Sequence, residues 1–368
     1  MSKPTLLLPG SLKDPYGRAA KQKKFNKYER AVDYLIERYR ESYDKSGANN
    51  KIFVLKAQTA SGKSTANVAE TFLNVLAPRG EQKTMIVTQP RIITAKANIP
   101  QITEFYEPHI ELGRNIGWST GSDKFRPREK PAILSVTVGT LTQQLQNWTD
   151  EEIINAYRFI MIDETHERSI EIDVTLFLLK SLFLRNKSRK DFPFIVLMSA
   201  TFDAQPFIDY FGISRDNFIF VQGASQPINT HWMLKEETRS VGTTIGDVVR
   251  HIVLDAGAKD ESDEADILIF LPGAGEIKSA SAVLATFNEE LAKTKPDHIF
   301  SLLQLDRRAV KTQNEDMKKL MAEPRSWKEK IAGKTVTPRR RIILSTAIAE
   351  TGLTLNNLKY VLDVGFSR

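Results

Sequence analysis

The stretch at residues 57–65, Ala-Gln-Thr-Ala-Ser-Gly-Lys-Ser-Thr, limits the possible folds of this chain more than any other feature. The apolar run at 52–55 precedes it and predicts a buried strand, and residues 64–76 follow it and predict a helix. A turn between a strand and a helix presents backbone N–H groups at the helix N-terminus, where the helix dipole favours an anion. The stretch therefore predicts a phosphate-binding loop in an α/β fold.

Three residues of this loop are suited to bind a nucleotide. Gly62 lets the backbone approach a phosphate closely. The Lys63 ammonium can reach the β- and γ-phosphates, and the Ser64 hydroxyl can hold Mg²⁺. The strict pattern G-x-x-x-x-G-K-[ST] has glycine where this chain has Ala57. A surface turn is the alternative interpretation of the Gly-Lys-Ser sequence, and the flanking strand and helix favour the phosphate loop over it.

A second stretch, Asp-Glu-Thr-His at 163–166, follows the apolar run 159–162. In open α/β sheets ligands bind beyond the carboxyl ends of the strands, so this position suits a ligand site. Asp163 can hold Mg²⁺ there, and Glu164 can orient and deprotonate an attacking water. The alternative is a charged turn in which Asp163 or Thr165 caps a helix. The phosphate loop upstream favours the catalytic interpretation, and together the two stretches predict an NTP-hydrolysing enzyme.

The composition restricts the class of protein further. At 368 residues the chain has room for two domains, and 41% hydrophobic residues can form their cores. The net charge of +7 fits a polyanionic partner. The chain has no cysteine, so no disulfide framework is expected, and its five histidines lack metal-ligand spacing. No apolar run reaches membrane-spanning length. We expect an intracellular protein, cytoplasmic or nuclear, and leave viral or cellular origin open.

Alternating strand and helix patterns divide the chain into three parts. Residues 1–50 are predicted to be a basic extension that contains a helix over 28–43. Residues 51–224 and 225–368 each alternate apolar strands with helical stretches, which is typical of parallel sheets. Residues 255–266 are polar and predict a solvent-exposed loop. The predicted strands lie at 52–55, 85–88, 132–136, 159–162, 195–198, 218–221, 267–271, 341–345 and 360–363.

Further short motifs follow the predicted strands in a fixed order. They are Val-Thr-Gln-Pro-Arg at 87–91, Thr-Val-Gly-Thr-Leu at 137–141, Ser-Ala-Thr at 199–201, Ile-Leu-Ile-Phe-Leu-Pro-Gly-Ala-Gly-Glu-Ile at 267–277, Ser-Thr-Ala-Ile-Ala-Glu-Thr-Gly-Leu-Thr at 345–354 and Val-Leu-Asp-Val-Gly-Phe at 361–366. With the two stretches above, this set resembles the superfamily 2 DExH helicases, most closely the DEAH/RHA branch and related viral RNA helicases. The resemblance covers residues 52–368. It implies two tandem RecA-like parallel-sheet domains, of which the second is truncated here.

The resemblance assigns roles to individual residues. It implies that Glu164, Lys63 and His166 are catalytic and that Ser64 and Asp163 hold the metal. Ser199 and Thr201 match a motif that couples hydrolysis to unwinding. The remaining assignments fall into two groups: nucleotide-binding residues, which are Thr59, Gly62, Lys63, Ser64, Thr65, Glu350 and Asp363, and nucleic-acid-contacting residues, which are Gln89, Pro90, Arg91, Thr137, Gly139, Thr140 and Thr346.

The resemblance also implies cofactors and partners. ATP or another NTP, with Mg²⁺, is expected as the nucleotide, and a nucleic acid, RNA rather than DNA, as the partner. Contacts to the nucleic-acid backbone carry no base information, so such a motor is expected to tolerate many sequences. The core is expected to be monomeric, or part of a larger protein or complex. Two alternatives stay open at this point: a translocase that does not unwind, and an RNA-binding scaffold with weak catalysis.

One departure from the family concerns arginines. The family has a Gln/Arg/Gly-rich motif after the last strands of its second domain, and its arginines reach the γ-phosphate. The chain stops at Arg368, before such a motif, so we expect this chain alone to bind NTP but to hydrolyse it slowly. Arginine fingers contribute about 10³–10⁵ in rate in other NTPases. The run at 339–341 is not a substitute for that motif and predicts a solvated basic edge.

Overall fold

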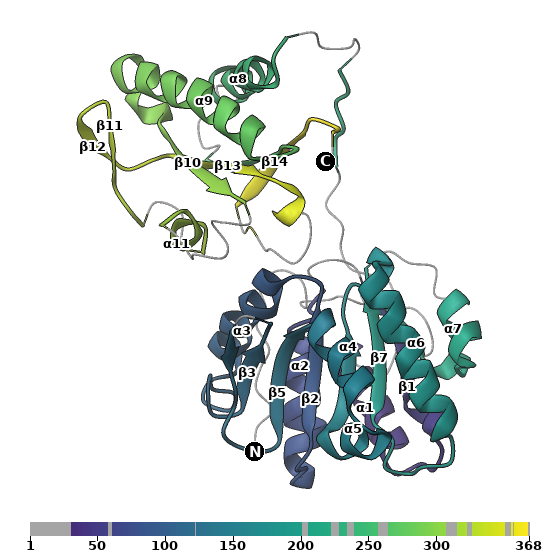
Figure 1. The fold of residues 1–368 in the computed structure, drawn as a ribbon. Helices are drawn as coiled ribbons and strands as arrows, with labels where there is room; N and C mark the ends of the chain where they lie inside the picture. The colour runs from purple at the N-terminus through teal and green to yellow at the C-terminus, as the bar shows by residue number, and fades with distance from the viewer. Residues whose placement is uncertain are drawn as a thin grey trace. The chain divides into compact units, whose positions relative to one another are not determined.

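The computed structural model describes residues 31–57, 61–121, 123–200, 205–221, 228–233, 239–256, 264–306, 315–321, 326–349, 355 and 357–366. Internal contacts divide the chain into two compact units, Met1–Pro227 and Ile228–Arg368 (Figure 1). We call them the first and the second unit and describe each by itself. The assignment of residues 51–224 to an ATP-binding domain and 225–368 to a helicase C-terminal domain stays a prediction.

An eight-stranded sheet forms the middle of the first unit. Its order is β4-β3-β5-β2-β6-β7-β1-β8, and all neighbours are parallel except β3 and β4. Parallel strands need crossover helices, which the stretches between the strands supply. The strands are β1 (Ile52–Ala57), β2 (Thr84–Gln89), β3 (Ile116–Ser119), β4 (Lys124–Phe125), β5 (Ala132–Thr137), β6 (Tyr157–Ile162), β7 (Phe194–Ser199) and β8 (Phe218–Val221).

Helices cover both faces of this sheet, and each face has its own apolar core. Phe53 and Leu55 of β1 pack with α1, α2 and α3, whereas Ile52 and Val54 pack with the helices of the other face, because successive side chains of a strand point to opposite sides. Figure 1 shows α4, α5 and α6 on the near face. The helices are α1 (Ala31–Tyr43), α2 (Ala66–Thr71), which continues as a π-turn (Phe72–Leu76), α3 (Ile92–Tyr106), α4 (Val138–Asn147), α5 (Asp150–Ala156), α6 (Ile170–Arg185) and α7 (Gln205–Phe211).

The helix α1 is part of the core of the first unit. Its Tyr39 is fully buried and meets the rings of three strand residues edge to face, with centroid distances of 5.0 Å to Phe53, 5.2 Å to Phe159 and 5.8 Å to Phe194. Such pairs stabilise beyond the area they bury. The described part of the predicted N-terminal extension therefore packs as a helix of the α/β domain.

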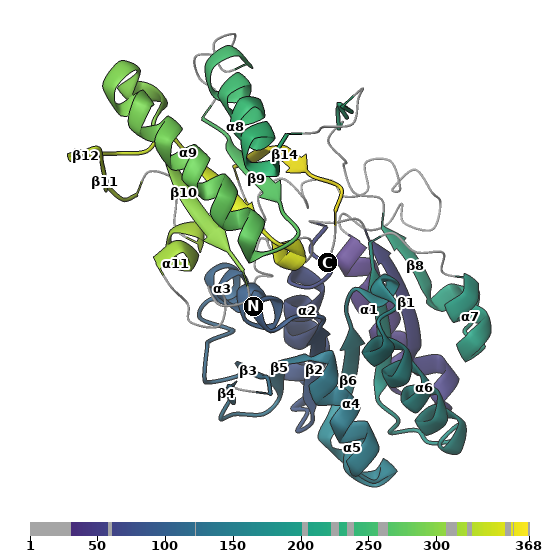
Figure 2. The ribbon, with the colours of Figure 1, turned by 45° about the horizontal axis from the view of Figure 1, so that its top comes forward.

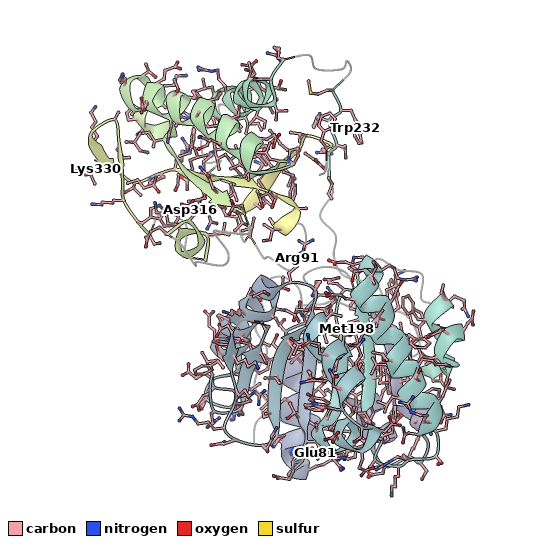
Figure 3. The ribbon with its side chains drawn as sticks, viewed as in Figure 1. Glu81, Arg91, Met198, Trp232, Asp316 and Lys330 are labelled. Carbon is pink, nitrogen blue, oxygen red and sulfur yellow. The ribbon has the colours of Figure 1, made fainter. Side chains whose placement is uncertain are left out.

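A charged cluster closes the amino-terminal edge of the same sheet, around Glu81 (labelled in Figure 3). The Tyr43 hydroxyl donates to the Glu81 carboxylate, and Arg158 Nε donates to the same Oε2 at 2.6 Å. Burial alone raises the pKa of Glu81, but the hydrogen bonds from Tyr43 and Arg158 hold it below its ordinary value. The ionised carboxylate therefore stabilises the fold.

The pKa of Glu81 gives a prediction about acid stability. Because the folded pKa lies below the unfolded one, this stabilisation is complete above the unfolded pKa, about 4.3, and is lost as the pH falls through the folded pKa. Glu81→Gln is expected to lower the free energy of unfolding at pH 7 and to flatten its decline in acid. Urea unfolding at a series of pH values measures both. Glu104→Gln, at an exposed position of α3, is the control, and an equal effect of the two changes contradicts the prediction.

A four-stranded parallel sheet in the order β10-β13-β9-β14 forms the second unit. Each of the nine strands predicted from the sequence overlaps an observed strand in one of the two units, and the α/β fold class is confirmed. Within the described ranges, none of the helices combines the length and apolarity that crossing a membrane requires. The elements are α8 (Val241–His251), β9 (Asp266–Phe270), α9 (Ala274–Thr294), β10 (Phe300–Leu305), α11 (Glu315–Met321), β11 (Glu329–Ile331), β12 (Lys334–Val336), β13 (Arg340–Ser345) and β14 (Leu358–Asp363).

Two expectations for the second unit were wrong. Arg340 and Arg341 do not form a solvated edge: both are 3% exposed at the start of β13. Asp266 is not a loop residue but begins β9, fully buried. Its carboxylate accepts from Arg341 Nε at 2.7 Å and from the Arg341 backbone N–H at 2.8 Å. A buried charge is retained when it is paired and hydrogen-bonded, and neither residue shows its partner in the local sequence.

Candidate nucleotide site

The predicted site residues of the first unit that the structure describes gather at the carboxyl edge of its sheet. Ser199 ends β7 and Gln89 ends β2, while Asp163 directly follows β6. The strands β5, β2, β6, β7 and β1 are consecutive neighbours, and Gln89 pairs in register with Thr137. Parallel strands bring their carboxyl ends to one edge, so motifs up to about 140 residues apart in sequence meet there.

The described part of the phosphate loop wraps the start of α2. Gly62 has φ +84°, a left-handed conformation that glycine adopts without strain. Its carbonyl accepts from the N–H of Thr65 at 3.3 Å and of Asn67 at 3.0 Å. This turn sends the Lys63 side chain inward, where it is 8% exposed. Thr59 lies outside the described residues.

Lys63 is held by two carboxylates from the end of β6. Its Nζ lies 2.8 Å from Glu164 Oε1 and 3.9 Å from Asp163 Oδ1. Burial lowers the pKa of Lys63, but Asp163 and Glu164 outweigh it and the net pKa is raised. Burial raises the pKa of Glu164, as does the charge of Asp163, and Lys63 only partly offsets them. The cluster therefore holds a charged lysine beside a carboxylate with increased proton affinity.

Asp163 is the centre of a second set of contacts. Its Oδ2 accepts from the Ser64 hydroxyl and, at 2.8 Å, from Gln89 Nε2. Its Oδ1 accepts from the backbone N–H of Glu164 at 2.9 Å. The Ser64 hydroxyl and the Asp163 carboxylate thus converge on one point and offer hard oxygen donors, which is the ligand type that Mg²⁺ prefers. This donor set fits a magnesium ion.

The backbone of Glu164 is unusual. Its φ of 51° and ψ of 40° place a residue other than glycine in the left-handed region. Such conformations cost about 1–3 kcal/mol and persist where the surrounding structure imposes them. Here the bend turns Glu164 back toward Lys63 as the chain leaves β6. The sequence contains no signal for this conformation.

A series of polar contacts leads from Glu164 to the neighbouring strand β7. His166 Nδ1 lies 3.3 Å from Glu164 Oε2 and 2.9 Å from the Ser199 hydroxyl. Thr165 Oγ1 also donates to the Met198 carbonyl at 3.0 Å. The structure thus brings Glu164, His166 and Ser199 together. Thr201, the other residue of the predicted coupling motif, lies outside the described residues.

The predicted nucleic-acid residues lie along the same edge. The hydroxyls of Thr137 and Thr140 are 2.9 Å apart at the start of α4, and Gly139 lies between them in the chain. Pro90 and Arg91 lead from β2 into α3, where Arg91 is the residue before the first turn (Figure 3). Gln89, which is predicted to contact nucleic acid, donates from Nε2 to Asp163 in this structure.

In the second unit the predicted residues are less closely grouped. Thr346 follows β13, and its N–H donates to the Leu305 carbonyl at 3.3 Å. Asp363 is exposed at the end of β14 and accepts from the Gly365 N–H at 2.8 Å. Glu350 lies outside the described residues.

Sequence reasoning missed one buried polar residue behind the site. Asn67, 4% exposed on α2, directs its amide to two methionine sulfurs, at 3.9 Å from Met161 Sδ and 3.4 Å from Met198 Sδ. It therefore connects α2 to both β6 and β7. An asparagine inside an apolar helical pattern was the only available signal.

The phosphate loop, the acidic pair after β6 and the parallel sheet define a P-loop NTPase fold. Residues 40–208 match the model of the DEAD/DEAH box helicase family. The matched segment of the chain is therefore a DEAD/DEAH box helicase domain.

Named relatives agree with this assignment. The chain is 34% identical over 389 aligned positions to B962L of African swine fever virus, a protein named as an RNA helicase, and the match covers 100% of this chain and 39% of B962L. It is 28% identical to the human ATP-dependent RNA helicase TDRD9, covering 91% of this chain and 24% of that protein. The crystal structure of the Escherichia coli DEAH/RHA helicase HrpB matches with a TM-score of 0.66 at 22% identity, over 92% of this chain and 37% of HrpB, which shows a shared fold. The chain thus spans about two fifths of the length of its viral relatives.

Proposed function

We propose that this chain is the NTP-hydrolysing core of an RNA helicase. The observation that supports this most strongly is the cluster in which Lys63 and Ser64 of the phosphate loop meet Asp163 and Glu164 after β6. The cluster combines a cation for phosphates, an oxygen pair for Mg²⁺ and a carboxylate base within hydrogen-bonding distance of each other. The relatives named as RNA helicases favour RNA over DNA as the nucleic acid.

Each residue then has a chemical role. Lys63 leaves Glu164 and binds the β- and γ-phosphates of the nucleotide, for which ATP is the first candidate. Ser64 and Asp163 would hold Mg²⁺, which, when bound, would neutralise charge that develops on the phosphates. Glu164, freed from Lys63, accepts a proton from the attacking water, a role that its raised pKa suits. Gln89 fixes the orientation of the Asp163 carboxylate.

The chain of contacts from Glu164 through His166 to Ser199 supports a link between hydrolysis and movement. Loss of the γ-phosphate changes the position of Glu164, and His166 passes this change to the end of β7. Residues 137–140 and Arg91 then contact the RNA backbone along the same edge. These contacts involve phosphate and sugar, so binding is expected to tolerate any base sequence.

The test is steady-state hydrolysis of ATP by this chain with Mg²⁺, measured with and without single-stranded RNA and with DNA of the same sequence. We expect slow hydrolysis that RNA increases more than DNA does. Arg91→Glu is expected to reduce the stimulation by RNA while basal hydrolysis persists. A chain that hydrolyses ATP at one rate in all three conditions would show that the proposal is wrong.

A further inference from the structure

The hairpin of β11 and β12 stands out from the second unit (Figures 1 and 2). Its strands are antiparallel, with Lys330 opposite Thr335 and Ile331 opposite Lys334. Ala332 and Gly333 form the turn, with φ of 47° and 79°. A two-residue turn with positive φ at both central residues has a twist that matches the twist of the strands it joins. The hairpin is therefore a defined element with two distinct faces.

The inner face of this hairpin is fixed to the rest of the second unit. Glu329 Oε1 accepts from Ser301 Oγ at 2.7 Å and from Trp327 Nε1 at 3.0 Å, and it pairs with the ammonium of Lys319. The half-buried Ile331 and Val336 pack against the core of the unit. Two-stranded hairpins are marginally stable alone, so these contacts hold the strands in place.

The outer face of the hairpin is cationic. Lys328, Lys330, Thr335 and Thr337 are all exposed, and Lys334 is exposed beside the turn (Lys330 is labelled in Figure 3). Glu329 is the one acidic residue between positions 326 and 341, and it points inward. Among the residues that the structure describes, no carboxylate pairs with any of these three lysines. The face thus offers ammonium groups and hydroxyls together, which is the combination that contacts nucleic-acid phosphates.

More positive charge lies where the hairpin enters β13. The Arg339 backbone N–H donates to the Ile299 carbonyl at 2.7 Å, which places Arg339 beside His298. Burial and the nearby cations Arg339, Lys295 and Arg340 hold the pKa of His298 below its ordinary value. Cationic residues therefore continue from the hairpin to the amino-terminal end of β13.

This basic region is separate from the edge that carries the helicase motifs. Ser301, to which the hairpin is anchored, is the second residue of β10, and Arg340 is the first residue of β13. Thr346 follows the opposite, carboxyl end of β13. A nucleic acid bound along the motifs and one bound at the hairpin therefore contact opposite edges of the second sheet.

Lysines on an exposed edge strand also prevent strand addition by other chains. That function requires a charge of either sign, whereas attraction to phosphates requires positive charge. Replacing lysine by glutamate therefore still prevents strand addition, but it turns the attraction to phosphates into repulsion. One pair of substitutions thus distinguishes protection of the edge strand from RNA binding.

We propose that the outer face of the β11–β12 hairpin is a second binding surface for single-stranded RNA, apart from the motif-bearing edge. This proposal rests on the proposed function, because it takes RNA to be the nucleic acid that the chain binds. The lysines and threonines contact backbone phosphates, so the surface has no base preference. It would hold RNA that has left or not yet entered the motif-bearing edge and would lengthen the bound segment.

The experiment compares the chain with K328E/K330E in binding a fluorescent single-stranded oligouridine RNA, at several salt concentrations. Two lost phosphate contacts predict about tenfold weaker binding and a smaller slope of log affinity against log salt, by about one to two. The control K45E/K187E changes two exposed lysines of the first unit and shifts the net charge equally. It is expected to stay within twofold of the unaltered chain. Circular dichroism melting checks that all variants are folded.

Each possible result either supports or contradicts the proposed RNA-binding surface on the hairpin. Weakening in K328E/K330E but not in K45E/K187E supports the surface. Equal affinities of these two variants overturn it, because net charge alone then explains binding. If Arg91→Glu weakens RNA binding and K328E/K330E does not, the result supports the proposed function and contradicts the RNA-binding surface on the hairpin. If the unaltered chain binds no RNA, both are wrong.

Discussion

Glu164→Gln is expected to lower NTP hydrolysis by about 10²–10⁴-fold while nucleotide binding is kept or strengthened. The carboxylate that accepts the proton is lost, so the chemical step slows. The amide carries no charge to hold Lys63, which the carboxylate binds at 2.8 Å, so Lys63 is freer to bind phosphates. Single-turnover hydrolysis and equilibrium binding of Mg-ATP measure the two effects separately.

The pH dependence adds a second criterion to this prediction. Glu164 must be ionised to accept a proton, and burial beside Asp163 raises its pKa. Hydrolysis by the unaltered chain is therefore expected to fall as the pH drops through this raised pKa, and the residual activity of Glu164→Gln should lack that decline. Asp173→Asn, which removes an exposed partner of Arg168, is the matched control and should change hydrolysis less than twofold. Similar losses in both variants would rule out Glu164 as the base.

Tyr39→Ala is expected to reduce the free energy of unfolding by about 3–5 kcal/mol, the range for removing a large aromatic side chain from a core. Tyr39 is fully buried against three phenylalanines of the central strands. Tyr39→Phe keeps the ring and should cost much less. Chemical denaturation followed by tryptophan fluorescence and by circular dichroism gives the change in the first unit.

Tyr210 of α7, 43% exposed, provides the comparison for an aromatic side chain outside the core. Tyr210→Ala is expected to change stability by less than about 1 kcal/mol. If Tyr39→Ala costs no more than Tyr210→Ala, α1 does not contribute to the core as its contacts indicate. A large loss would show that a fragment beginning at residue 51 lacks a structural helix.

Much of the fold follows from local pattern. Long apolar runs such as Phe194–Ser199 read as buried strands because both faces are covered in a parallel sheet. The short strands β3 and β4 escaped prediction because four and two residues give no clear period. In β10 the exposed Gln304 interrupts the apolar pattern, so this strand was not predicted from the sequence either.

The sequence predicted that the residues of the motifs would gather at one edge of the sheet, but it did not predict the contacts between them. The spacing of motifs indicated that Lys63 and Asp163 would meet, since both lie at carboxyl ends of parallel strands. The Gln89 contact to Asp163 and the left-handed Glu164 depend on side-chain packing in three dimensions, which a linear pattern does not contain. The same limit explains Arg341: its partner Asp266 is 75 residues away.

Asn67 donates to the thioether sulfurs of Met161 and Met198, and oxidation of these two sulfurs would mark the core behind the site. Met161 and Met198 are fully buried, so an oxidant reaches them only when the first unit opens. Sulfoxide formation would convert each soft, weak acceptor into a polar group inside the core, two residues before Asp163 or one before Ser199. Peroxide damage would therefore act on the ends of β6 and β7 together, and the mass of the peptides that carry these methionines would report how often the first unit opens.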